Sequence, residues 1–150
     1  MNSPREALLT AISNCLVRIK RVDGYQTDAG EAVTREPAPV AAEVESEFIA
    51  AIWAKQERAA DPALVRTHRL TTVQVIAKVN ASLVDAQARL DAITSDIEAA
   101  MADQQFRYPV GIQFPQYQSA EPLVPQQPTI GWIGVSIAYT SHIPIRRPAA

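Results

Sequence analysis

The sequence predicts an α+β fold, a single domain in which two main helices pack on one face of a mixed or antiparallel β-sheet. Three observations predict it. Apolar residues recur at helical spacing in two stretches, near 4–22 and 83–104, whereas residues near 47–56, 67–80 and 131–143 alternate as strands do. The order helix, three strands, helix, loop and strand lacks the strict strand–helix alternation of a parallel sheet. No internal repeat or domain boundary is visible in 150 residues, a length that fits one domain.

Composition and charge limit the classes of function. The net charge of −2 gives no basic surface for direct sequence-specific binding of nucleic acid or for binding an anionic membrane. The chain shows no secretory signal and no apolar stretch long enough to cross a bilayer. The single cysteine, Cys15, excludes a disulfide within the chain. We therefore expect a protein of the cytosol or of a soluble assembly, with no membrane partner.

The first expected helix runs from Pro4 to about Val22. Ser3 and Glu6 form a capping-box pattern, Pro4 suits the first helical position, and Gly24 is a stop signal. Three cationic residues are expected in the last turn, where the helix dipole favours them: Arg18, Lys20 and Arg21. One apolar stripe is expected to face the core: Ala7, Leu8, Ala11, Ile12, Cys15, Leu16 and Ile19.

The middle of the chain predicts strands. A turn-rich segment, Gly24 to Gly30, precedes a candidate short strand at 31–35, and prolines interrupt regular structure after it. The segment 47–56 predicts a strand, although its pattern alone leaves a short helix open. A loop is expected at 58–64. The segment 67–80 is rich in β-branched residues and predicts a long strand.

The second expected helix runs from about Leu83 to Gln104, with a capping box from Ser82 and Asp85. Its apolar stripe is formed by Ala86, Leu90, Ile93, Ile97, Ala100 and Met101. Its charged residues are expected mostly to face water: Asp85, Arg89, Asp96, Glu98 and Asp103.

Two C-terminal segments are candidates for contact with partners. The proline-rich and glutamine-rich stretch at about 105–129 is interpreted as a long loop or arm that contacts a neighbour, because four aromatic residues are unusual for a disordered segment: Phe106, Tyr108, Phe114 and Tyr117. The extended tail at 144–150 carries Arg146 and Arg147, which form either a contact arm or a frayed terminus. On the last strand, Trp132 is expected either at an interface or in a strand buried on both faces.

The sequence predicts no catalytic, cofactor-binding or metal site, and no cofactor. It contains no glycine-rich phosphate loop and no nucleophile elbow. His68 and His142 have no ligand spacing, and Cys15 lies on the apolar stripe of the first helix, where a thiol packs as a small hydrophobe. Three carboxylates spaced two apart would share one face of a strand, where an acidic strand edge is favoured over an acid/base or metal cluster: Glu43, Glu45 and Glu47.

The order of elements resembles the tail terminator and tail-completion proteins of long-tailed phages. The first helix leads into a Tyr-x-Thr-Asp-x-Gly turn at 25–30, followed by Ala32 and Val33. The central strand contains Arg-Leu-Thr-Thr-Val-Gln-Val at 69–75, and the second helix contains Ile-Thr-Ser-Asp-Ile-Glu-Ala-Ala-Met at 93–101. The last strand contains Gly-Val-Ser-Ile-Ala-Tyr-Thr at 134–140. The similarity covers most of the chain and is weakest at 37–47 and 106–128.

The resemblance implies a virion structural protein without enzymatic activity. It implies a homo-oligomeric ring, commonly a hexamer, at the head-proximal end of the tail tube, assembled in the host cytoplasm. Its partners would be further copies of itself, the tail tube protein and a head-completion or connector protein. The turn residues Tyr25, Thr27 and Asp28 become candidate interaction residues through this resemblance, although a turn with a helix stop explains them equally well. Two alternatives remain open, a different connector or tail tube subunit, and a small enzyme that uses its carboxylates or His68.

Overall fold

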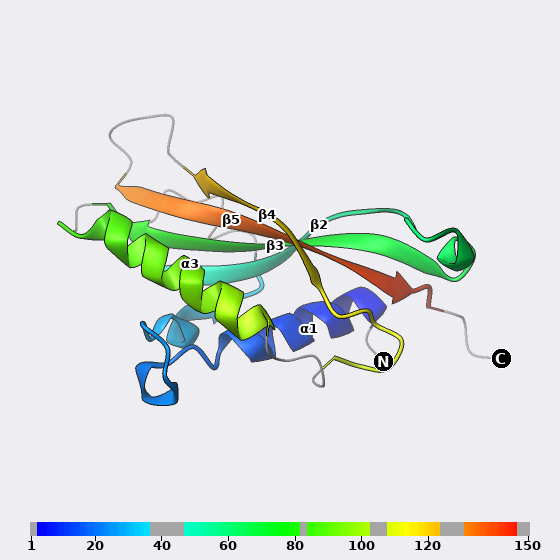
Figure 1. The fold of residues 1–150 in the computed structure, drawn as a ribbon, viewed down its shortest axis with the longest axis horizontal. Helices are drawn as coiled ribbons and strands as arrows, with labels where there is room; N and C mark the ends of the chain where they lie inside the picture. The colour runs from blue at the N-terminus through cyan, green and yellow to red at the C-terminus, as the bar shows by residue number, and fades with distance from the viewer. Residues whose placement is uncertain (1–2, 37–46, 82–83, 103–107, 124–130, 147–150) are drawn as a thin grey trace.

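The computed structural model describes residues 3–36, 47–81, 84–102, 108–123 and 131–146, and it confirms the α+β fold. Two helices, α1 (Pro4–Leu16) and α3 (Ala86–Ala102), lie against the same face of a mixed five-stranded sheet (Figure 1). The strand order is β1-β2-β3-β5-β4. The strands are β1 (Val33–Thr34), β2 (Phe48–Arg58), β3 (His68–Asn80), β4 (Gln116–Leu123) and β5 (Trp132–Pro144).

The long strands pair along most of their length. β3 pairs antiparallel with β2 on one side and with β5 along its whole length on the other. β4 pairs antiparallel with β5 and forms one edge, whereas β1 is parallel to β2 and pairs with it only at Ile49 and Ala50. β2 and β4 each contain a bulge, a device that bends a strand and re-aims its side chains. The β2–β3 hairpin extends beyond α1 and ends in a short 3-10 helix, η3 (Pro62–Leu64) (Figure 1).

The core lies between the helices and the sheet. Six of the seven predicted stripe residues of α1 and its extension are buried, and Ala7 is half-buried. All six predicted stripe residues of α3 are buried. They pack against alternate residues of the central strands, including Val73, Val75, Ala77, Val135 and Ile137. The helical and strand periodicities in the sequence therefore identified the core correctly.

The first helix is shorter than predicted. α1 ends at Leu16, so the three cationic residues lie outside its last turn, and that prediction is wrong. The chain leaves the helix because Ile19 is fully buried and its carbonyl accepts a hydrogen bond from the amide of Gly30, 2.9 Å away. A separate 3-10 turn, η1 (Arg21–Asp23), follows, and Gly24 stops this turn with φ = 94°.

The prediction of a loop through 105–129 is wrong for residues 116–123, which form β4. Seven of the eight residues of this strand are exposed, so the apolar alternation that signals a half-buried strand is missing. Pro122 suits an edge strand, because it has no amide to donate to a second neighbour. The predicted cap Ser82 and the end of α3 beyond Ala102 lie outside the described residues.

The sheet face opposite the helices is buried at one end and open at the other. Near the start of β2, Ala50, Ile76 and Lys78 are at most 5% exposed. The Lys78 ammonium lies 4.0 Å from the centre of the Trp132 ring and 5.8 Å from that of Phe48. Burial lowers the pKa of Lys78. At this end the strands are therefore buried on both faces, one of the two environments predicted for Trp132.

Candidate assembly surface

The Tyr-x-Thr-Asp-x-Gly turn is held against α3 by one buried carboxylate. Asp96 accepts hydrogen bonds from the Gln26 amide at 3.0 Å, the Thr27 amide at 2.8 Å and the Thr27 hydroxyl at 2.7 Å. The Thr27 oxygen in turn accepts a bond from the Ala29 amide at 3.3 Å. Asp96 and Thr27 are both buried, so the prediction that Asp96 faces water is wrong. Burying a carboxylate is costly unless it accepts several hydrogen bonds, and this turn supplies three.

The other turn residues also bond locally. Asp28 accepts a hydrogen bond from the Arg21 amide at 2.9 Å, and the Arg21 guanidinium donates to the Gln26 carbonyl at 3.2 Å. Tyr25 is half-buried against the core. Of the three turn residues predicted to contact partners, Thr27 is thus inside the fold, whereas Tyr25 and Asp28 keep some exposed surface.

Tyr108, one of the predicted aromatic contact residues, packs against the core. The Tyr108 hydroxyl lies 3.8 Å from the Cys15 sulfur and 4.0 Å from the Met101 sulfur. The Tyr108 and Phe114 rings meet edge to face with centroids 5.6 Å apart. Burial, with the neighbouring Cys15 thiol, raises the pKa of Tyr108. Phe106 lies outside the described residues.

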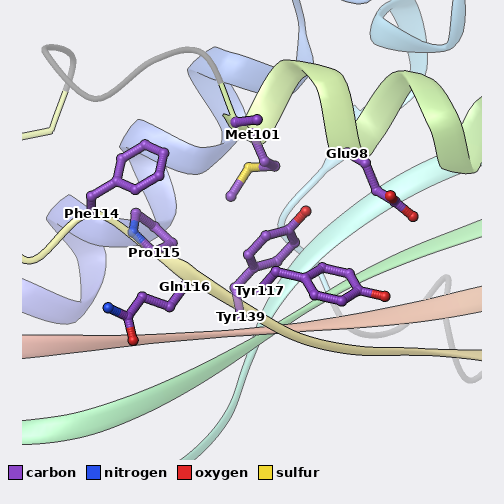
Figure 2. A pocket seen from close by; sticks show the side chains of 8 residues that line it. Glu98, Met101, Phe114, Pro115, Gln116, Tyr117 and Tyr139 are labelled. Atoms are coloured by element: carbon purple, nitrogen blue, oxygen red, sulfur yellow. The ribbon is translucent and has the colours of Figure 1, made fainter.

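An apolar groove runs between the end of α3 and the start of β4 (Figure 2). Its volume is about 380 Å³. Its walls are formed by Glu98, Met101, Ala102, Phe114, Pro115, Gln116, Tyr117 and Tyr139. Met101 and Glu98 project from α3 toward the two tyrosines, and Glu98 is the only acidic side chain of this lining (Figure 2). The groove therefore combines aromatic walls with one negative charge.

Tyr117 and Tyr139 form the floor of this groove. Their rings meet edge to face with centroids 5.9 Å apart. Tyr139 is buried, and its pKa is raised by burial, by the Glu98 carboxylate and by Tyr117. Tyr117 is 51% exposed, although its paired position on β4 holds it in place. A large aromatic side chain that is fixed but still exposed is typical of a protein–protein contact.

β4 continues this surface along the edge of the sheet. Seven of its eight residues pair with β5 on one side, Gln118 being the bulged residue, and its outer side pairs with no strand that the structure describes. An edge strand presents a row of amide and carbonyl groups that a strand of another chain can pair with. The candidate assembly surface is therefore the aromatic groove together with the outer side of β4.

The remaining predicted contact residues lie elsewhere. Trp132 is half-buried on the face opposite the helices, next to Lys78, and its indole nitrogen has no hydrogen-bond partner within the described chain. Arg146 is exposed beyond the end of β5. Arg147 lies outside the described residues. The structure thus does not unite these residues with the groove. Of the predicted contact residues that the structure describes, Phe114 and Tyr117 are the two that line the groove.

The groups considered for catalysis or metal binding have structural partners. His142 Nε2 accepts a hydrogen bond from the Ala60 amide at 3.0 Å, so Nδ1 is the protonated nitrogen and donates to Gln113 at 2.9 Å. His68 bonds to the hydroxyl of the preceding threonine at 2.7 Å. Glu47 forms a two-pronged ion pair with Arg89 at 2.7 and 2.8 Å. Within the described ranges, no three histidine, cysteine or acidic residues cluster as metal ligands would. Glu43 and Glu45 lie outside those ranges.

Three residues of importance were not identified from the sequence. Asp96 lies three residues after Ile93 and one before Ile97, a spacing that places it on the buried stripe of α3 and could have revealed it. Glu98 and Tyr139 become groove residues only through the pairing of β4 with β5, which no local pattern indicates.

Of the helices that the structure describes, none has the length and apolarity needed to span a membrane. No family model matches the chain, and no curated protein matches it in sequence.

Proposed function

We propose that the protein is a structural component of a phage tail that assembles into a ring and terminates the tail tube. The observation that carries the proposal is the candidate assembly surface, an exposed edge strand beside an aromatic groove. The resemblance in the order of elements supplies the phage assignment. The function would be interfacial and not enzymatic.

The mechanism follows from the geometry of closed assemblies. A contact between two different surfaces of one protein repeats from copy to copy and closes into a ring when the rotation between copies divides a full turn. A hexameric ring seated on the last layer of the tail tube would cover the surface on which the next tube subunit adds. Its opposite side would then be free to bind a head-completion or connector protein.

The exposed aromatic side chain of the groove has a role in this proposal. Tyr117 presents large apolar area at low entropic cost, because its ring is already oriented by Tyr139. Tyr117→Ser should therefore weaken assembly while changing the free energy of unfolding of the monomer by only about 1 kcal/mol, the worth of one aromatic pair. Val22→Ser is a matched control, since Val22 is also exposed but lies outside the groove.

The test is native mass and negative-stain imaging of the purified protein over a wide range of concentration. A closed particle of fixed copy number, lost in Tyr117→Ser and kept in Val22→Ser, is the expected result. Open-ended tubes of variable length would contradict a terminator and favour a tail tube subunit. A monomer at every concentration would contradict assembly of this protein by itself.

A further inference from the structure

The sheet has a second open edge, on β2. β1 pairs with β2 only at Ile49 and Ala50, near the start of an eleven-residue strand. From Trp53 to Arg58, β3 is the only strand that pairs with β2 in the part of the chain that the structure describes. This outer side of β2 is long enough to receive a strand of ordinary length.

The two open edges have matching directions. β2 and β5 run the same way, since both are antiparallel to β3, and β4 runs the opposite way. If a second copy continues the sheet in the same orientation, its β2 meets β4 of the first copy in antiparallel pairing. The junction would then extend the antiparallel pattern that already joins β2, β3, β5 and β4.

We propose that copies of this protein join by adding β4 of one copy to the outer side of β2 of the next, with Glu121 opposite Lys55. The inference rests on the proposed ring, whose subunit contact it specifies. It uses two different edges, as a closing head-to-tail contact requires. The sheet then runs from copy to copy around the ring, with the helices of all copies on the same side.

Face and charge select this register. Glu121 pairs with Ser136 and Lys55 pairs with Thr72, positions on the face opposite the helices, so their alignment keeps the two faces continuous. A shift by one residue would turn every side chain to the wrong face. Glu121 is the only charged residue of β4, and in this register it faces Lys55, which also pairs with Glu57 of its own strand at 3.2 Å; a shift by two residues would set Glu121 opposite Glu57 itself. A shift by two in the other direction would bring β4 toward the position of β1.

The same register satisfies the geometry of a closed sheet. Within one copy, Glu121 pairs with Ser136, Ser136 pairs with Ile76 of β3, and Ile76 pairs with Ala50 of β2. Lys55 of β2 pairs instead with Thr72, which lies four residues before Ile76 on β3. Placing Glu121 opposite Lys55 of the next copy therefore offsets neighbouring copies by four residues along the strands. Four residues correspond to about 13 Å along the strands, and four strands to about 19 Å across them. The strands would therefore incline by about 35° to the ring axis, at the lower end of the tilts that closed sheets adopt.

Disulfide cross-linking of Glu121→Cys with Lys55→Cys tests the proposal. Paired residues of antiparallel strands have Cα atoms about 4.5–5.5 Å apart, within reach of a disulfide. In one chain the two positions are separated by β3 and β5, about 14 Å across the sheet, so no internal bond can form. The natural cysteine, Cys15, is buried. Glu121→Cys with Glu57→Cys is a control two residues out of register.

The expected result is a ladder of covalent oligomers on a non-reducing gel for the Lys55 pair, at least tenfold stronger than for the Glu57 pair. Association without this ladder would overturn the strand pairing and leave ring formation by another contact. A ladder without a closed particle would support the pairing and contradict the terminator. No association and no ladder at any concentration would overturn the pairing.

Discussion

Removing the Asp96 carboxylate should be among the most damaging changes to the monomer. In Asp96→Ala the buried Thr27 amide and hydroxyl lose their acceptor, and so does the less buried Gln26 amide. A buried donor left without a partner costs about 1–3 kcal/mol, whereas an amide near the surface can bond to water. We expect a loss of about 3 kcal/mol in the free energy of unfolding, which lowers Tm by about 6–12 °C for a domain of this size.

Asp96→Asn keeps the size of the side chain but changes its hydrogen bonds, so it separates the two contributions to stability. The amide of asparagine keeps one acceptor oxygen and turns an NH₂ group toward one of the donors, so at least one bond is lost and the charge is removed. The expected loss is about 1–2 kcal/mol, between the wild type and alanine. Asp91→Ala is the control, because Asp91 is exposed on the same helix and should change stability by less than about 0.5 kcal/mol.

Urea unfolding followed by circular dichroism measures these differences. The combination with Thr27→Val tests whether the two residues act together, since the valine should cost less in the Asp96→Ala background than in the wild type. An Asp96→Ala variant as stable as Asp91→Ala would refute the assignment of this carboxylate as the anchor of the turn. Additive effects of the two substitutions would show that the Thr27 bonds do not contribute through Asp96.

Four further changes have defined outcomes. Gly30→Ala should cost about 2 kcal/mol in urea unfolding, because its Cβ would lie 2.6–2.8 Å from backbone atoms. Arg89→Ala should cost about 1 kcal/mol by removing a partly exposed two-pronged pair with Glu47, and the loss should shrink in high salt if that pair is its cause. Burial raises the pKa of Tyr108, so above about pH 10 the tyrosine ionises in the unfolded chain but not in the folded one, and the free energy of unfolding falls. The Tyr108→Phe variant should therefore lose less unfolding free energy than the wild type between pH 10 and 11. Burial lowers the pKa of Lys78, so the cost of burying its charge is full at neutral pH and fades as the pH rises toward about 10.4; Lys78→Met should remove this contribution to the pH dependence of urea unfolding.

The elements that could be predicted from the sequence are the helices and strands that bury one face and expose the other. The stripes of α1 and α3 and the alternation in β3 and β5 each record which side chains meet the core, so spacing alone identified them. Helix ends were less accurate, because α1 stops where Ile19 must turn inward, a requirement set by the distant Gly30. A tertiary contact of that kind leaves no trace in local spacing.

The assembly surface shows the opposite limit. β4 is exposed along nearly its whole length, and a strand without a buried face has no apolar period to detect. Its aromatic residues were identified as candidates, and Phe114 and Tyr117 do line a groove. Tyr108 instead packs beside Cys15 and Met101, because an aromatic residue in a proline-rich segment can serve the core as readily as a partner.

The motif that carries the resemblance and the surface proposed for assembly are separate parts of the molecule. Thr27 of the turn donates to Asp96 inside the fold, whereas Glu121 and Lys55 are exposed at opposite edges of the sheet. A similarity in the turn therefore argues for a shared fold and says little about the subunit contact. It follows that Asp96 variants should lower the unfolding free energy of the monomer, whereas a charge reversal at Glu121 should change the assembled mass at unchanged monomer stability. Glu121→Lys combined with Lys55→Glu should then restore the assembled mass, a rescue that the proposed register requires and that a contact elsewhere on the surface would not produce.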